Sequence, residues 1–332
     1  SEAAQIAMRL TFFHWGLHPW AIYVVVGLSL SYFSYRKKLP LTIRSSLYPL
    51  IGNKIYGPIG HTVDILAVFG TVFGVATSLG LGVTQMNTGL NLMFGMDISL
   101  GNQILLIGVI SSIATLSVVS GVGRGVKILS EVNMCLTAGV LVFLLCFGPT
   151  RFLLSSLIQN IGDYLSNLLS LSTWTDSYTD SKWQSSWTAF YWGWWMAWAP
   201  FVGMFIARVS KGRTIREFII GVLLVPSLLG FIWLTLFGSN ALYLELFHHI
   251  TDASGELVAV VGQAGVVDAT NSDITTALYV TLEKLDNGFF GTLAAFTATL
   301  LTSTYLITSS DSGTLVITTI LSMGDENLPL GH

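Results

Sequence analysis

The chain has 332 residues, of which 52% are hydrophobic and only 10% are charged. An ordinary soluble domain carries roughly 25% charged residues, so this composition excludes a soluble enzyme, a disordered protein and a secreted disulfide scaffold. The net charge of −3 says little as a total, but the charges are unevenly distributed along the chain.

Seven segments without Asp, Glu, Lys or Arg are each long enough to cross a bilayer core, which takes about 20 apolar residues. They are residues 10–35, 65–96, 98–123, 132–150, 188–207, 218–244 and 288–310. They predict an all-α polytopic membrane protein, because an outer-membrane barrel would show short alternating segments.

Lys and Arg gather after the first, third and fifth segments, whereas the intervening loops are mainly acidic. Basic residues mark the cytoplasmic side, so residue 1 is expected to be external and residue 332 cytoplasmic. A chain that begins outside, enters a span almost at once and has no initiating Met is expected to be a piece of a longer protein.

The connecting segments carry patterns of their own. Residues 40–58 contain three prolines and predict a cytoplasmic connection with a short surface helix. Residues 152–169 repeat apolar residues at helical spacing, which predicts a helix lying along the outer interface with Asn160 on its polar side. Residues 250–286 form another large external segment, with helical potential at 273–285.

Two of the seven segments are rich in small polar residues. The second contains Gly70, Thr71 and Gly74, and the seventh leads through Thr308 to Asp311. Small residues let helices approach closely, and for the second segment this explanation stays open beside an ion site lined by hydroxyls and freed carbonyls. For residues 308–311 a functional role is favoured, because an acidic residue at the end of such a run is costly without one.

Six of the ten tryptophans fall between residues 183 and 198. They are Trp183, Trp187, Trp192, Trp194, Trp195 and Trp198. An interfacial aromatic belt accounts for the first three, but the last three lie about 10–16 Å deeper along a helix. Several ring faces together attract a quaternary ammonium group, so this segment predicts a cage for such a cation, with core packing as the alternative. Pro200 is expected to loosen the helix in mid-membrane.

The first segment holds a second aromatic group, made of Phe12, Phe13, Trp15, Trp20 and Tyr23. His14 and His18 lie between these rings at i, i+4 spacing, which suits a metal. No third ligand lies nearby in sequence, so no metal site is predicted. No catalytic residue, cofactor or nucleic-acid partner is predicted.

Three motifs are long enough to identify a family. They are Trp194-Trp195-Met-Ala-Trp198-Ala-Pro200-Phe201-Val-Gly203-Met-Phe205, Phe13-His14-Trp15-Gly-Leu-His18-Pro-Trp20-Ala-Ile-Tyr23 and Thr308-Ser309-Ser310-Asp311-Ser312-Gly313. These motifs closely resemble the betaine/choline/carnitine transporter family. Residues 32–44 and 57–65 are similar to its bacterial choline transporter branch, and the resemblance covers essentially the whole chain.

The resemblance implies a fragment of a twelve-span transporter in which two inverted five-helix repeats form a core like that of the sodium-coupled amino-acid transporters. Residues 1–150 would then hold family spans four to seven, in the first repeat. Residues 151–187 would form an external interfacial helix and loop, and residues 188–332 would hold spans eight to ten, in the second repeat. Spans one to three, eleven and twelve would be absent. The resemblance also implies a bacterial inner-membrane protein, surrounded by lipid and assembled as a homotrimer.

Site residues are carried over by matching the motifs. Trp194, Trp195 and Trp198, with Phe190 before them, match the central substrate cage, and Trp15, Trp20 and Tyr23 match a second aromatic cluster along the access path. Thr308 and Ser309 match the hydroxyl pair of the main cation site, with Asp311 beside it. Thr71 and Phe201 match part of a further cation site, in which Val75 replaces a second threonine.

The resulting hypothesis is an ion-coupled secondary transporter that imports choline or a related trimethylammonium osmolyte by alternating access. Sodium-coupled glycine betaine transport is the alternative. An integral-membrane enzyme acting on choline headgroups would need a nucleophile or metal cluster, and an ion channel has no use for a deep cage. Because Val75 removes one sodium ligand, proton coupling is predicted over sodium coupling, with His14, His18, Asp64 and Asp311 as unranked proton carriers.

Overall fold

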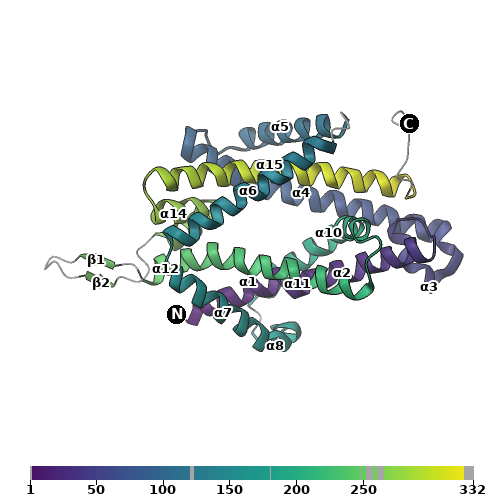
Figure 1. The fold of residues 1–332 in the computed structure, drawn as a ribbon, viewed down its shortest axis with the longest axis horizontal. Coiled ribbons are helices and arrows are strands. Elements are labelled where there is room, and N and C mark those ends of the chain that lie inside the picture. The colour runs from purple at the N-terminus through teal and green to yellow at the C-terminus, as the bar shows by residue number, and fades with distance from the viewer. Residues whose placement is uncertain are drawn as a thin grey trace. The chain divides into compact units, whose positions relative to one another are not determined.

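The computed structural model describes residues 2–119, 123–179, 181–247, 249–251, 257–259 and 265–324. Nearly all of these residues are helical, and one short hairpin accompanies the helices (Figure 1). The chain forms two compact units, each built from three separate stretches. Unit 1 comprises Ser1–Phe12, Leu79–Leu169 and Gly230–Thr308, and unit 2 comprises Phe13–Ser78, Ser170–Leu229 and Ser309–His332.

The elements of the N-terminal half are α1 (Glu2–Trp15), α2 (Leu17–Ser31), η1 (Tyr32–Arg36), η2 (Ile43–Leu47), α3 (Tyr48–Ile51), η3 (Gly52–Tyr56), α4 (Pro58–Phe94), α5 (Leu100–Val119), α6 (Gly123–Phe147), α7 (Thr150–Ser166) and α8 (Leu168–Thr173). Those that follow are α9 (Trp183–Ser186), α10 (Thr188–Val209), α11 (Ile215–Leu234), η4 (Thr235–Ser239), α12 (Asn240–Leu246), β1 (His249–Thr251), β2 (Leu257–Ala259), α13 (Val266–Ser272), η5 (Ile274–Thr276), α14 (Ala277–Leu285) and α15 (Phe289–Leu321).

Five helical stretches in the described part of the chain are long and apolar enough to cross a membrane. They are Glu2–Arg36, Pro58–Phe94, Ile128–Phe147, Ile215–Leu246 and Phe289–Leu321. They coincide with five of the seven predicted segments, which confirms the helical membrane-protein fold class, while the twelve-span plan with its inverted repeats stays a prediction. The shorter apolar helix Leu100–Leu116 falls on the third segment. Helix α10 falls on the fifth but is not among the five, because indole and phenol rings add little hydropathy.

Several helix boundaries differ from the predicted ones. Helix α6 already begins at Gly123, which the sequence assigned to the preceding span, and α15 continues through Asp311 to Leu321. The first span is interrupted at Gly16, whose φ of −96° and ψ of −131° are not helical. Pro19 explains this break, because it has no N–H to donate to the carbonyl four residues earlier. The ends at residues 1 and 332 lie outside the described residues.

Unit 1 has two apolar cores. Val140 of α6, Leu153 of α7 and Leu282 of α14 belong to one core, which also takes in α15. Val83 of α4 and Ile110 of α5 belong to the other, where a Cβ on Gly82 would lie 2.6 Å from Leu306 Cδ2. A glycine of the second predicted segment therefore serves close helix packing here.

The predicted interfacial helix over 152–169 is present as α7 and α8, but its faces are not as expected. Asn160 lies on the packed side with Leu153 and Tyr164, whereas Ile158 is 75% exposed. Aromatic packing determines which face of α7 is buried, since the Tyr164 ring packs edge-on against the Phe12 ring, with centroids 6.3 Å apart. The assignment of Asn160 to a polar outer face is therefore wrong.

The external segment over 250–286 is more structured than predicted. Its expected helix is confirmed as α14, and α13 and η5 precede it. The antiparallel pairing of β1 with β2, with Ile250 opposite Val258, had no signal in the sequence analysis. Residues 252–256 and 260–264 of this segment lie outside the described residues.

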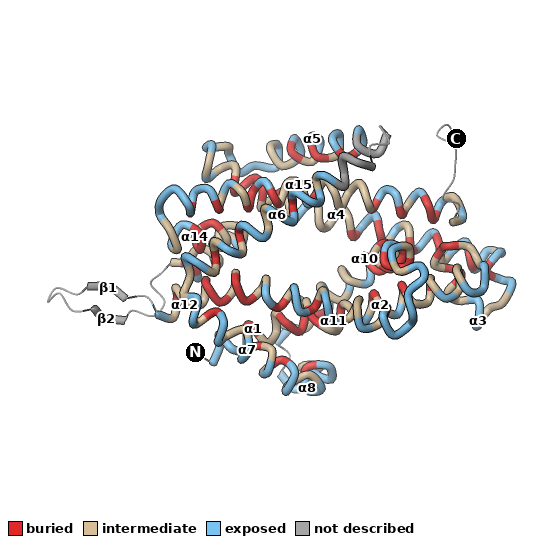
Figure 2. The backbone as a smooth tube through the Cα atoms, viewed as in Figure 1, coloured by how far each residue is buried: buried red, intermediate tan, exposed pale blue. Residues whose placement is uncertain are grey.

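Unit 2 is organised around the contact between α2 and α10, which are far apart in sequence (Figure 1). A Cβ on Gly27 would lie 3.2 Å from the carbonyl oxygen of Gly203, and one on Gly203 would lie 2.6 Å from Cγ1 of Val26. The absence of both side chains therefore lets the two backbones approach closely. Met204 and Ala207, which follow Gly203 on α10, are fully buried in the same unit. Figure 2 shows buried residues along α10.

The connection over 40–58 is confirmed as short helical turns, η2, α3 and η3. A buried ion pair ties it to α4: Arg44 Nε lies 3.2 Å from Asp64 Oδ2, and the Arg44 backbone N–H donates to Oδ1 at 3.0 Å. His61 Nδ1 lies 3.2 Å from the Arg44 guanidinium. The Asp64 carboxylate therefore binds this connection to α4.

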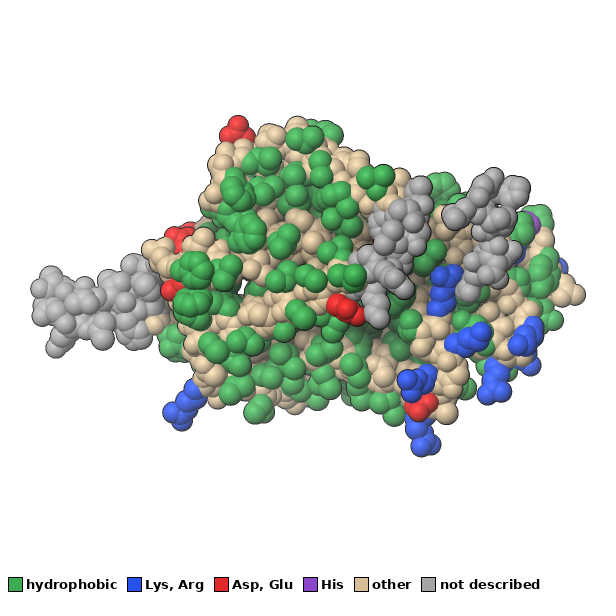
Figure 3. All heavy atoms as spheres, turned by 45° about the horizontal axis from the view of Figure 1, so that its top comes forward, with side chains coloured by type: hydrophobic (Ala, Val, Ile, Leu, Met, Phe, Trp, Pro, Cys, Tyr) green, Lys and Arg blue, Asp and Glu red, His purple; other side chains and the backbone are tan. Residues whose placement is uncertain are grey.

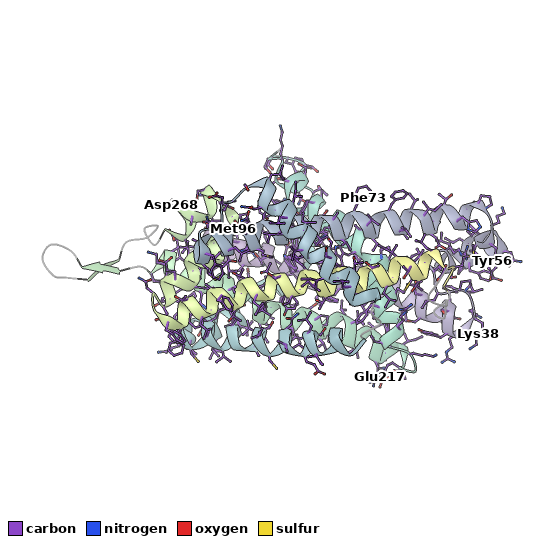
Figure 4. The ribbon with its side chains drawn as sticks, turned by 90° about the horizontal axis from the view of Figure 1, so that it is seen from above. Lys38, Tyr56, Phe73, Met96, Glu217 and Asp268 are labelled. Atoms are coloured by element: carbon purple, nitrogen blue, oxygen red, sulfur yellow. The ribbon has the colours of Figure 1, made fainter. Side chains whose placement is uncertain are left out.

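Much of the visible surface is apolar (Figure 3). Phe73 is 66% exposed and points outward from α4 (Figure 4). Exposed apolar surface of this extent is a liability in water but suits a lipid environment.

Candidate substrate-binding site

The tryptophan-rich segment forms α10, which runs unbroken through Pro200. The predicted loosening at this proline does not interrupt the helix, although Pro200 removes one backbone donor there. The spacing of Trp187, Tyr191, Trp194 and Trp198 predicts one shared helix face. Successive ring centroids of the first three are 6.4 Å and 6.2 Å apart, whereas the Trp198 ring contacts Phe201.

Three indole rings form the centre of the site. Trp194 and Trp195 are nearly parallel, with centroids 5.8 Å apart and planes inclined by 10°. Trp15, at the end of α1, stands almost perpendicular to Trp195, at 4.8 Å and 84°, and lies 6.2 Å from Trp194. In a perpendicular pair, the positive edge of one ring meets the negative face of the other.

Helix α2 extends this ring cluster. Tyr23 lies perpendicular to Trp195 at 6.1 Å, and Trp20 lies 5.4 Å from Tyr23. The seven predicted substrate residues were assigned to two clusters, a cage and an access path. In unit 2, Trp15 and Tyr23 of the access-path set instead contact Trp195 directly, so the two sets form one continuous cluster.

Hydrogen bonds fix two of the indoles. Trp195 Nε1 donates to the backbone carbonyl of His14 at 2.9 Å, at the helix end created by the break at Gly16. Trp194 Nε1 donates to Ser78 Oγ of α4 at 3.2 Å. These bonds leave the ring faces available while holding the ring orientations.

Trp198 is set apart from the other two cage residues. Among the described residues its ring partner is Phe201, at 5.0 Å, and its Nε1 is buried without an acceptor. A Cβ on Gly74 would lie 2.9 Å from Trp198 Cδ1, so this glycine of α4 makes room for the indole. Phe190 contacts Trp194 at 5.8 Å and is 45% exposed, which puts it at the rim of the cluster.

A group of rings around His14 and His18 lies next to the cluster. His14 is 3% exposed, stacks on Tyr191 at 4.9 Å, and lies 3.0 Å from Thr188 Oγ1 through Nε2. Trp192 stacks on His18 at 5.9 Å and also contacts His14. The i, i+4 spacing of the histidines lets both rings contact Trp192, which the sequence assigned to the interfacial belt. Among the described residues, no three His, Cys, Asp or Glu side chains are grouped to hold a metal.

The predicted ion-coupling residues lie on α4, α10 and α15. Thr71 is 1% exposed and donates to Ala67 O at 2.9 Å, and Phe201 packs in the same core as Ala67. Val75 faces α15, because a Cβ on Gly313 would lie 3.1 Å from its Cγ2. Thr308 donates to carbonyls of its own helix at 3.1 Å, and Ser309 and Asp311 follow it on α15, each half-buried.

The family model of the betaine/carnitine/choline family transporters matches residues 1–332. The chain belongs to this family. A glycine betaine transporter of Acinetobacter baylyi is 46% identical over 325 residues, which are 98% of this chain and 47% of that protein. The high-affinity choline transport protein of Escherichia coli K12 is 43% identical over 317 residues, 95% of this chain and 44% of that protein. A glycine betaine/proline/choline transporter of Vibrio parahaemolyticus is 43% identical over 327 residues, 98% of this chain and 56% of that protein.

The chain thus spans about half the length of these curated relatives, as the shares of 44% to 56% state. Membership of the betaine/carnitine/choline family and the membrane-length helices together make it a multi-pass inner-membrane protein. The named relatives are transporters, which points away from an enzyme.

Proposed function

We propose that the full-length protein imports choline, or a related trimethylammonium osmolyte such as glycine betaine. The observation that carries this proposal is the convergence of Trp15, Trp194 and Trp195, with centroids 4.8 Å to 6.2 Å apart. In the Trp15–Trp195 pair, an aromatic edge takes the place that a trimethylammonium group would occupy over an indole face. When the substrate binds, its trimethylammonium group would replace that aromatic edge over the indole face.

The chemistry of the surrounding helices suits a cation without N–H donors. Neither α2 nor α10 contains an Asp or Glu, so attraction must come from ring faces. A primary amine would favour carboxylates and carbonyls, which accept its hydrogen bonds, whereas a quaternary ammonium gains nothing from them as acceptors. The named relatives carry choline, glycine betaine or both. Choline is favoured here by the likeness of residues 32–44 to the choline branch, and glycine betaine is the alternative.

The proposed mechanism is alternating access driven by an ion gradient. A negative interior already favours choline entry, by about 2.3 kcal/mol per charge per 100 mV. A co-transported ion adds to this, and a zwitterion such as glycine betaine depends on it entirely.

We favour a proton as the coupling ion over sodium. Sodium needs several oxygen ligands, and Val75 offers a methyl group towards α15 at Gly313 where a threonine would offer a hydroxyl. Of the proton carriers suggested by sequence, Asp64 forms an ion pair with Arg44 at 3.2 Å, and His14, His18 and Asp311 stay unranked beside it.

Counterflow of radiolabelled choline into vesicles that contain the full-length protein tests the transporter proposal. Choline-loaded vesicles are expected to accumulate label without an imposed ion gradient or chemical turnover, and unloaded vesicles are the control. Equal label in both would contradict carrier function, and a chemically changed label would favour an enzyme acting on choline headgroups. Uptake at fixed membrane potential, with sodium and pH varied separately, tests the coupling ion. Uptake that requires sodium and does not respond to a pH gradient would show that sodium, and not a proton, is the coupling ion.

A further inference from the structure

Unit 2 also contains a cavity, which lies away from the tryptophan cluster. It has a volume of about 730 Å³ and lies between the end of α2 with the π-helical turn η1 and the turn that joins α10 to α11. The charge distribution along the chain puts both of these turns on the cytoplasmic side. The cavity therefore opens where a helix pair leaves the membrane.

Basic side chains form the rim of this cavity. Arg36 and Lys37 line it from η1, and Lys211 and Arg213 line it from the opposite turn. All four are exposed, and Lys and Arg side chains gather in one region of the face shown in Figure 3. No Asp or Glu is among the lining residues. The rim therefore carries a concentrated positive potential that no carboxylate among the lining residues neutralises.

Two tyrosines hold the lysines at the rim. The ammonium of Lys211 lies 5.4 Å from the ring centroid of Tyr35, and that of Lys37 lies 5.8 Å from that of Tyr32. Both tyrosines line the cavity. A cation–π contact engages one side of an ammonium group, which leaves its other N–H donors for an anion.

An acidic group close in sequence to the cavity, Glu217, is already engaged. Glu217 accepts from the Thr214 backbone N–H at 2.9 Å and lies 3.1 Å from the Thr214 hydroxyl, and so caps the beginning of α11. Its charge also interacts with Arg213, but it does not line the cavity. Figure 4 labels Glu217 at this helix end. Because this carboxylate is bound in the helix cap, the four basic side chains at the rim keep an excess of positive charge.

The inner wall of the cavity is apolar. Leu28 of α2 and Ile215 and Phe218 of α11 line it. Phe218 is 5% exposed and reaches the backbone of α2, since a Cβ on Gly27 would lie 3.1 Å from its Cζ. A basic rim above an apolar wall, at the level where spans end, matches a molecule with a phosphate at one end and a hydrocarbon chain at the other.

We propose that this cavity binds the phosphate headgroup of an anionic membrane lipid, held by Arg36, Lys37, Lys211 and Arg213. The apolar wall receives the start of an acyl chain, which distinguishes the lipid from a soluble phosphate compound. The assignment is independent of the transported substrate, because its residues are separate from the tryptophan cluster.

The test is native mass spectrometry of the full-length protein in detergent, with phosphatidylglycerol or phosphatidylcholine added at equal concentration. The wild type is expected to retain phosphatidylglycerol selectively. The double variant Lys211→Gln, Arg213→Gln is expected to lose at least about tenfold in retention, since it removes two direct charge-assisted contacts to the phosphate. The matched control is Lys38→Gln, Lys54→Gln, which removes the same charge from exposed cytoplasmic positions outside the cavity and is expected to change retention less than twofold.

Three outcomes would overturn the proposal. One is unchanged selectivity in the cavity variant, and another is an equal loss in the control variant, which would show only diffuse attraction. The third is displacement of phosphatidylglycerol by an equal concentration of inorganic phosphate, which would identify a soluble anion as the occupant. Arg36→Gln, Lys37→Gln on the opposite wall gives the same test should the first variant fail to fold.

Discussion

Helices α10 and α15 are both unusual in sequence, one rich in tryptophan and the other in hydroxyls, and the structure uses them differently. The indole N–H groups of Trp194 and Trp195 bond to other parts of the chain, at Ser78 and His14. The hydroxyls of Thr302, Thr304 and Thr308 donate to carbonyls within α15 itself. The two indole N–H groups of α10 therefore fix a tertiary site, whereas these three hydroxyls of α15 are satisfied within their own helix.

The difference between the indoles of α10 and the hydroxyls of α15 has a physical cause. A hydroxyl near a helix backbone can always reach the carbonyl four residues earlier, so it needs no tertiary partner inside a membrane. An indole N–H is carried too far from its own backbone to do the same, so any hydrogen bond that it makes is to another part of the structure. A tryptophan-rich helix is consequently the better indicator of a preorganised site, and a hydroxyl-rich helix offers ligands that a bound ion has to recruit.

The largest effect is expected from Trp195→Ala. It removes the ring that contacts Trp15, Trp194 and Tyr23, together with the bond to His14 O. Loss of one desolvated cation–π partner is worth about 2 kcal/mol, or roughly thirtyfold in choline affinity. Equilibrium binding of labelled choline to the full-length protein measures it.

Trp195→Phe is the matched control for that experiment, because it keeps a ring face and removes only the N–H. Its loss is expected to be several times smaller. Wild-type affinity in the alanine variant would contradict the cage assignment, and equal losses in both variants would show that the bond to His14, and not the ring face, matters.

The next effect concerns the packing that places α10. Gly203→Ala puts a methyl group 2.6 Å from Val26 Cγ1, and overpacking of this kind costs about 1–3 kcal/mol. Gly193 lies on the same helix with nothing within 4 Å of a Cβ. Gly193→Ala should therefore be neutral or slightly stabilising, since alanine favours a helix more than glycine does. Thermal unfolding of the two purified variants gives the comparison, and equal melting temperatures would mean that α2 and α10 are not held by close approach at Gly203.

A smaller effect separates the two members of the aromatic set on the first span. Trp15 contacts Trp195 at 4.8 Å, whereas the ring contact of Trp20 among the described residues is with Tyr23, at 5.4 Å. Trp15→Ala is expected to weaken choline uptake by about tenfold and Trp20→Ala by less than about threefold. Concentration-dependent uptake in cells that express each variant distinguishes them. A larger loss for Trp20 would restore the two-cluster arrangement expected from the motifs alone.

Much of this fold was predictable from sequence, because apolar length defines membrane helices directly and the motifs around Trp194 and Trp15 identify a family. The residues of the ring cluster were predictable for the same reason. Their continuity was not, since it depends on the break at Gly16 and on the close approach at Gly27 and Gly203, which are tertiary facts. The burial of Asn160 was missed because the apolar periodicity of residues 152–169 puts this amide on the polar side of the helix. The pairing of Asp64 with Arg44 was missed because a basic residue in a connecting turn carries no signal of its partner.

The smallest effect tests α15 and bears on the coupling ion. Thr304 and Thr308 have the same local bonding: each donates to two carbonyls of its own helix, at 3.0 Å and 3.1 Å for Thr304 and at 3.1 Å for Thr308. Replacement of either by valine removes an equivalent helix bond and should change the free energy of unfolding by no more than about 0.5 kcal/mol. Thr308→Val alone also removes a candidate ligand of the coupling ion, so choline uptake is expected to fall about two- to fivefold in that variant and to stay unchanged in Thr304→Val. Because the two variants share every local consequence, the difference between their uptake rates isolates the ion. Equal rates would mean that the hydroxyl of Thr308 serves only its own helix, and the cation site would then have to be sought among residues other than those the motif supplies.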